Sequence, residues 1–144
     1  MSVPEAMPFY IPLGAPIPLE TACRVAEAAQ AEAARHNWKM AIAVVDPAGA
    51  LVLFLRIDDT QYASIEIAQA KARAAAMFRR STKVFQDGIN GGQPALATLP
   101  GVVASEGGLP LIENGVMIGA IGCSGGAGTQ DGVVVAAGAA VLKP

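Results

Sequence analysis

Four polar side chains lie in otherwise apolar parts of the chain, and together they would suit the binding of a carboxylate. Lys71 continues an apolar stripe that recurs every three or four residues, so its ammonium group projects from the apolar face of a helix. Ser64 lies two helical turns earlier, and Arg56 and Asp58 come just before this helix. A guanidinium and an ammonium group in one corner bind a carboxylate through charge-assisted hydrogen bonds. The alternative for Lys71 is structural, as a stem along apolar surface or as an ion pair with an acid.

A glycine-rich turn near the C-terminus is a second place where a polar ligand could be held. Ser124, Gly125 and Gly126 lead from an apolar run towards residues 133–142, which have the length and alanine content of a helix. Backbone N–H groups at the start of a helix can hold an anion or steady oxyanion charge. The alternative is that the glycines only allow close packing and that Asp131 only complements the helix dipole.

Two acids are candidates for moving a proton. Glu106 precedes Gly107 and Gly108 in a loop, and Asp131 follows the glycine-rich turn. With Lys71, these acids form the candidate catalytic set. The alternative for Glu106 is an ordinary exposed loop glutamate.

Two β-hairpins and two long helices should position these residues. Each hairpin joins two apolar runs through a turn with the residue types that tight reversals need. The runs are residues 39–45 and 51–57 around Asp46-Pro47-Ala48-Gly49, and residues 109–112 and 116–123 around Asn114-Gly115. Helices are expected over residues 19–36 and from residues 59 or 60 to 79, with a short one over residues 82–89. Both faces of the run 51–57 are apolar, so Arg56 is expected to be largely buried and to need a partner.

The N-terminal arm, residues 1–18, should be extended, because five prolines interrupt it. Its Phe9, Tyr10 and Ile11 would need cover from the body or from a neighbouring subunit. The sequence therefore divides into this arm and one domain over residues 19–144.

The composition predicts a homo-oligomer, a dimer or higher. The chain has 144 residues, of which 53% are hydrophobic and 15% charged. A small monomer would struggle to cover that much apolar surface. The formal net charge is −2 without a basic cluster, which argues against nucleic acid and anionic membranes as partners.

A soluble, cytoplasmic protein is expected. No apolar run approaches the ~20 residues that a membrane span needs, and no basic segment precedes an apolar one at the N-terminus. Cys23 and Cys123 lie far apart in apolar surroundings and should be reduced. His36 is the only histidine, and neither CxxC nor HExxH occurs, so no metal site is expected.

Six short motifs follow one another along most of the chain. They are Val44-Val45-Asp46 with Gly49, Arg56-Ile57-Asp58, Ser64-Ile65-Glu66-Ile67-Ala68 with Lys71-Ala72, Phe78-Arg79-Arg80-Ser81-Thr82-Lys83, Glu106-Gly107-Gly108-Leu109-Pro110, and Gly119-Ala120-Ile121-Gly122-Cys123-Ser124-Gly125-Gly126 with Asp131. In this order they resemble the GlcG/HbpS family, also called haem-degrading or DUF336, which includes the C-terminal domain of PduO proteins. The resemblance covers about residues 19–142.

The resemblance implies an α/β domain of the α+β type with a profilin-like architecture, in which helices flank an antiparallel sheet of about five strands. It also implies homodimers or larger assemblies. Some members bind haem or, in the PduO setting, are associated with cobalamin metabolism. Others are encoded with genes for small-acid catabolism. Fold follows from family membership more securely than function does.

Two classes of function remain open, with a non-catalytic carrier as a third. The first is haem or small-ligand binding near a subunit contact, where Arg56 or Lys71 neutralises propionates and His36 is a candidate iron ligand. The second is an isomerase, hydratase or lyase acting on a small carboxylic acid. The candidate catalytic residues are Lys71, Glu106 and Asp131, and the candidate ligand-binding residues are Arg56, Asp58, Ser64, Gly107, Gly108, Ser124, Gly125 and Gly126.

Overall fold

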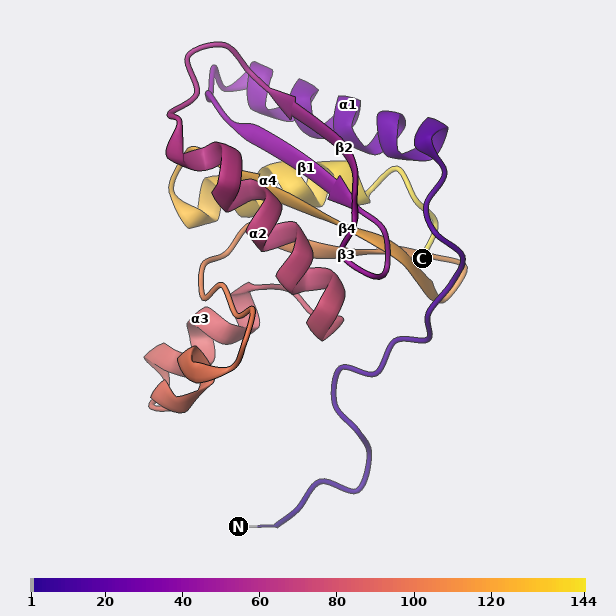
Figure 1. Cartoon of the computed structure of the whole chain (residues 1–144), viewed down its shortest axis with the longest axis vertical. Helices are drawn as coiled ribbons and strands as arrows, with labels where there is room; N and C mark the ends of the chain where they lie inside the picture. Colours follow the sequence, from indigo (N-terminus) through magenta and orange to yellow (C-terminus); the bar gives the residue numbers. More distant parts are fainter. Residues whose placement is uncertain (1) are drawn as a thin grey trace.

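A four-stranded antiparallel sheet organises the chain (Figure 1). The computed structural model describes residues 2–144. Its elements in chain order are α1 (Leu19–Arg35), β1 (Ala41–Val45), β2 (Leu51–Arg56), α2 (Ala63–Phe78), α3 (Lys83–Asn90), the 3-10 helix η1 (Pro94–Thr98), β3 (Gly108–Glu113), β4 (Val116–Ser124) and α4 (Gly128–Ala139). Within residues 2–144 the strand order is β2-β1-β4-β3, so the sheet has four strands rather than about five. No helix in this range is both long and apolar enough to cross a bilayer.

Helices cover both faces of the sheet, and β1 shows why. Its residues alternate between the two faces, as strand geometry requires. Ile42 and Val44 pack in the cluster that contains α1 and α4, whereas Ala41, Ala43 and Val45 pack in the cluster that contains α2. All five are buried. The α/β architecture that the resemblance implies therefore rests on one sheet with two apolar faces.

The face under α2 is built from alanine and glycine, and this brings the helix unusually close. Gly108 and Gly122 lie opposite each other on β3 and β4. A Cβ atom at Gly122 would overlap the carbonyl oxygen of Ala68 and would lie 2.5 Å from the backbone nitrogen of Ala72. The backbone of α2 therefore rests directly on the strands.

Both expected hairpins are present. Asn114 and Gly115 have φ angles of 52° and 82°, the left-handed pair that a two-residue hairpin turn requires. In the first hairpin, the Oδ1 atom of Asp46 accepts hydrogen bonds from the backbone N–H groups of Ala48 and Ala50. Asp46 thus closes its turn in the way that its position in the sequence predicts.

Two helix boundaries differ from the sequence prediction. The helix expected from residue 59 or 60 begins at Ala63, because Thr60 instead donates its hydroxyl to the carbonyl of Ile57. The C-terminal helix runs over Gly128–Ala139 rather than 133–142. Gln130 accepts the N–H of Ala127 at its start, so the last residues of the glycine-rich turn already belong to the helix.

The N-terminal arm attaches to the sheet where β1 ends. Met117 of β4 makes two backbone hydrogen bonds with the arm. The N–H of Gly14 donates to the carbonyl of Met117, and the N–H of Met117 donates to the carbonyl of Pro12. Only one isolated bridge forms, between Leu13 and Met117, so the arm lies beside the sheet without adding a fifth strand. Residues 2–10 are exposed, and the N-terminal end of the arm leads away from the body (Figure 1).

Candidate functional site

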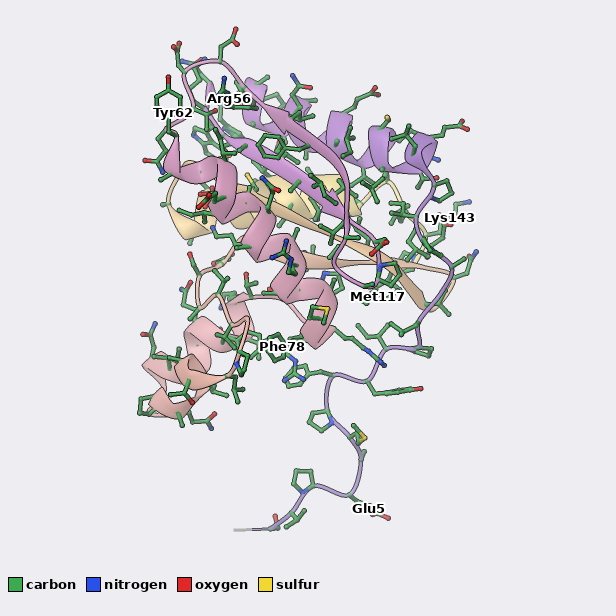
Figure 2. All side chains as sticks on the ribbon, viewed as in Figure 1. Glu5, Arg56, Tyr62, Phe78, Met117 and Lys143 are labelled. Atoms are coloured by element: carbon green, nitrogen blue, oxygen red, sulfur yellow. The ribbon has the colours of Figure 1, made fainter. Side chains whose placement is uncertain are left out.

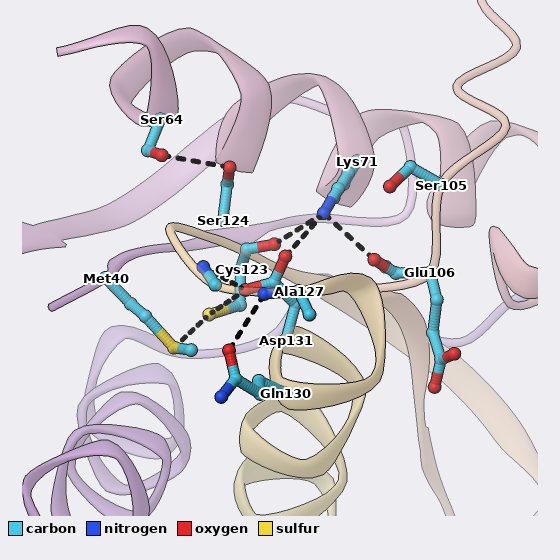
Figure 3. Close-up of polar contacts among 12 residues, drawn as sticks. Met40, Ser64, Lys71, Ser105, Glu106, Cys123, Ser124, Ala127, Gln130 and Asp131 are labelled. Atoms are coloured by element: carbon cyan, nitrogen blue, oxygen red, sulfur yellow. Dashed lines mark hydrogen bonds and ion pairs between the residues drawn. The ribbon is translucent and has the colours of Figure 1, made fainter. Parts of the chain in front are cut away.

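Lys71 lies at the centre of a buried polar cluster (Figure 3). Only 2% of the residue is exposed. Its Nζ atom donates to the carbonyl oxygens of Glu106 and Cys123, at 2.9 and 3.1 Å, and to Oδ2 of Asp131 at 3.0 Å. An ammonium group has three donors, and all three are used. Lys71 therefore has the structural ion pair that the sequence left open as an alternative.

Asp131 completes this pair from the first turns of α4. It is 2% exposed, and its Oδ1 atom accepts the N–H of Gly126 at 3.1 Å. Burial raises the pKa of the Asp131 carboxyl, while Lys71 and the Gly126 N–H act in the opposite direction. Burial also raises the pKa of the neighbouring Cys123 thiol well above its usual range, so this thiol stays protonated.

Glu106 and Gly107 support the cluster through their backbone. Gly107 has a φ of 126°, and a Cβ atom there would lie 2.9 Å from Nζ of Lys71. The Glu106 residue is half-buried, and its carboxylate lies against the Cα of Gly132 in α4, away from Lys71. The loop glycine is therefore required for the ion pair, whereas the Glu106 carboxylate takes no part in it.

The two serines meet beside the glycine-rich turn. Ser124 donates its hydroxyl to that of Ser64 at 3.0 Å, and Gln61 donates to the same oxygen at 2.9 Å. Both serines are buried. Gly125, with a φ of 146°, borders an open groove of about 330 Å³ that also contains Trp38. The serines thus join α2 to β4, and the groove beside them is largely polar.

Arg56 and Asp58 do not join Lys71, and the prediction that Arg56 is buried was wrong. Both residues are exposed. The Arg56 guanidinium lies over the ring of Tyr62, 5.8 Å from its centroid, at one end of the molecule (Figure 2). The reason is position: β2 is an edge strand and Arg56 is its last residue. An apolar alternation cannot reveal that a strand ends at the solvent.

His36 lies on the other side of the sheet from α2. It is the exposed C-cap of α1, stacks on Trp38 with 4.1 Å between ring centroids, and has Nε2 3.7 Å from a carboxylate oxygen of Glu32. Among residues 2–144, no group of three acidic, histidine or cysteine residues could hold a metal ion. The role of His36 as an iron ligand stays a prediction.

A second site, absent from the sequence prediction, lies where the N-terminal arm crosses the end of α2. We call it the arginine groove; its volume is about 300 Å³, and its lining consists of Met7, Pro8, Phe9, Tyr10, Met77, Phe78, Arg79 and Arg80. Arg79 donates to the carbonyl of Ile11 at 3.1 Å, and its guanidinium lies 5.6 Å from the ring centroid of Tyr10. The guanidinium of Arg80 lies 4.3 Å from the ring centroid of Phe9. Each aromatic ring therefore lies against one guanidinium group, although Phe9 and Tyr10 both stay exposed.

These two arginines lack a counter-ion. Arg79 and Arg80 are half-buried, and no described carboxylate oxygen lies within 4.0 Å of either. Burial lowers the pKa of Arg80, although a guanidinium stays protonated at any physiological pH. Partly buried guanidinium groups without a counter-ion favour an anionic ligand.

An apolar hollow continues the arginine groove. Its volume is about 390 Å³, and it is lined by Arg73, Ala74, Met77, Phe78, Pro100 and Gly101. Met77 and Phe78 belong to both. Apolar surface beside unpaired guanidinium groups can hold a ligand with an apolar body and a carboxylate. The sequence signal for this site is the presence of Phe9-Tyr10 in the arm and of Arg79-Arg80 at a helix end.

Comparison with known proteins is consistent with this architecture. The family model "Haem degrading protein HbpS-like" matches residues 17–140. Protein GlcG of Escherichia coli K12 is 42% identical over 105 residues, which are 73% of this chain and 78% of GlcG. The structure of Klebsiella pneumoniae ORFY superposes with a TM-score of 0.82 at 25% identity, covering 99% of this chain and 100% of ORFY. The structure of a double mutant of Streptomyces reticuli HbpS superposes with a TM-score of 0.82 at 28% identity, covering 100% of this chain and 98% of the mutant.

Proposed function

The chain belongs to the HbpS-like family, and from this premise we propose that it binds haem, or a related tetrapyrrole with carboxylate groups, in the arginine groove. The family description names haem. The observation that carries the proposal is the pair of half-buried guanidinium groups, Arg79 and Arg80, without a carboxylate partner beside apolar surface. A tetrapyrrole needs both features, because its ring is apolar and its propionates are anionic.

The residues of the groove fit haem on chemical grounds. Arg79 and Arg80 would hold the propionates, and Met77 and Phe78 would contact the ring. Tyr10 and Met77 carry side chains of types that serve as axial ligands to haem iron. Haem supplies redox and oxygen chemistry when it is bound. The chain's own part would be to bind the propionates and to contact the apolar ring.

A binding function is favoured over the isomerase, hydratase or lyase. That alternative assigned substrate binding to Lys71 and proton transfer to Glu106 or Asp131. The ammonium group of Lys71 has its three donors filled, and both Lys71 and Asp131 are 2% exposed. A substrate would have to break the ion pair before it could reach either group.

Replacing both groove arginines should weaken haemin binding at least about tenfold, because each charge-assisted contact contributes roughly 1.5–3 kcal/mol. The variant is Arg79→Gln with Arg80→Gln, which keeps the side-chain stems on Phe9 and Tyr10. The measurement is a Soret titration with haemin. Arg56→Gln is the matched control, since Arg56 is an exposed arginine that stacks on an aromatic ring far from the groove. His36→Ala should leave the affinity unchanged as well.

Haemin dimethyl ester, which lacks the propionate charges, distinguishes propionate recognition from non-specific binding of the apolar ring. Wild-type protein should bind the ester as weakly as the double variant binds haemin, and the double variant should not discriminate between the two. Equal affinity of wild-type protein for haemin and its ester would refute the arginine groove as the propionate site. A loss of affinity in His36→Ala alone would move the site to the opposite side of the sheet.

A further inference from the structure

The N-terminal arm exposes apolar side chains that its own chain leaves uncovered. The exposed fractions are 89% for Val3 and 77% for Met7. The whole protein exposes 7711 Å², whereas a compact monomer of this mass exposes about 6,900 Å². Apolar segments held away from the body in this way are typical of surfaces that bind a partner.

Within its own chain, Glu5 does not pair with Arg73 of the apolar hollow. Arg79 holds the carbonyl of Ile11 and Arg80 holds the ring of Phe9, so the chain direction is set at the edge of the arginine groove. Met7 and Pro8 still line this groove, but the start of the arm leads away from α2, and Glu5 lies well apart from Phe78 (Figure 2). The arm bends at residues 5–6 and turns at residues 8–9, where Phe9 has a φ of 60°, and even with these bends Glu5 stays apart from the hollow of its own chain.

Charge complementarity indicates where this segment docks. Glu5 is the only charged side chain among residues 1–19. Arg73 borders the apolar hollow, is exposed, and has no described carboxylate oxygen within 4.0 Å. In the arm, the acidic Glu5 lies between the apolar residues Val3 and Met7. In the hollow, the basic Arg73 lies beside apolar residues. The arm therefore matches the hollow in both charge and polarity.

We propose that residues 2–7 of one copy dock in the apolar hollow of a second copy, with Glu5 paired to Arg73, and that the two copies exchange arms reciprocally. Six to seven extended residues span roughly 20 Å, enough to cross to a neighbouring molecule. A reciprocal exchange is closed, so it gives a dimer and no filament. Each arm would also complete the open side of the partner's arginine groove, since the hollow and groove share Met77 and Phe78.

The test is sedimentation velocity of the full-length protein without haemin. Wild-type protein should be dimeric at micromolar concentration. Glu5→Arg and Arg73→Glu should each raise the dimer dissociation constant at least about tenfold, because each places like charges together. A mixture of these two variants should form dimers of wild-type affinity, since a heterodimer contains two restored pairs. Glu20→Arg is the control, because Glu20 is an exposed acid in the first turn of α1.

Each outcome decides the proposal. Rescue in the mixture requires arms that cross between chains, and supports it. Monomeric wild-type protein, or single reversals without effect, would overturn it. Rescue in the double variant Glu5→Arg, Arg73→Glu but not in the mixture would mean that each arm docks on its own chain. Failure here leaves the haemin titration unaffected, because that experiment reads the Arg79 and Arg80 contacts.

Discussion

Lys71→Met should lower the free energy of unfolding by about 3–5 kcal/mol, the usual cost of breaking a buried ion pair from one side. The methionine retains the apolar stem and removes the charge. Asp131 would then be a buried carboxylate without its cation, and the carbonyls of Glu106 and Cys123 would lose their donor. Urea unfolding followed by circular dichroism measures the loss.

The matched control is Lys83→Met. Lys83 forms a 2.6 Å ion pair with Asp87 on the surface of α3, and both side chains are more than half exposed. Solvent screens such a pair, so this variant should change stability little. Equal effects at the two lysines would contradict a special role for the buried pair.

The pH dependence of Lys71→Met identifies the unpaired carboxylate as the cause. Burial raises the pKa of Asp131 in the folded protein, and without Lys71 nothing of comparable strength opposes that rise. The folded variant therefore binds a proton more readily than the unfolded chain, so its stability should increase as pH falls through the folded pKa. Adding Asp131→Asn should remove this dependence and recover part of the lost stability at neutral pH. If the loss in the free energy of unfolding did not vary with pH, the lost contacts to the backbone carbonyls alone would explain it.

Gly122→Ala should destabilise the protein by about 3 kcal/mol or more, at the upper end for overpacking. The added Cβ would overlap the carbonyl oxygen of Ala68 and approach the backbone nitrogen of Ala72. Backbone atoms cannot rotate aside, so α2 must lift from the sheet. The shift should appear as a lower urea midpoint, and near-ultraviolet circular dichroism would report any loosened packing.

Gly128→Ala is the matched control for this substitution. Its Cβ would meet its nearest neighbours at 3.5 Å or more, an ordinary contact, and its φ is not positive. Helical alanine also reduces the entropy of the unfolded chain, so the change should be neutral or slightly stabilising. A comparable loss at both glycines would mean that backbone freedom, and not the approach of α2, explains Gly122.

Much of the fold is readable from local residue patterns. Asn114-Gly115 and the Asp46 turn fix the hairpins through short-range chemistry, and the helical spacing around Lys71 places its side chain inwards. The family resemblance added the arrangement of these elements. The resemblance implied about five strands, whereas the described residues form four, because the arm beside β4 makes only one isolated bridge.

The sites were harder to predict, for a different physical reason. Lys71 and Asp131 are 60 residues apart, and whether a buried cation serves a ligand or its own chain depends on how many of its donors are already filled. The exposure of Arg56 was also beyond local patterns. The alternation of apolar residues shows which face of a strand a side chain is on, but not where the strand ends. The contact between Phe9 and Arg80 joins residues 71 positions apart and has no local signal.

The close seating of α2 on Gly108 and Gly122 has an implication for where this fold can recognise anything at all. With one backbone layer resting on another, the interior offers no room beneath the helix in which a guest molecule could be enclosed. A ligand must therefore bind in grooves at the surface, such as the arginine groove, which the chain lines on one side and leaves open on the other.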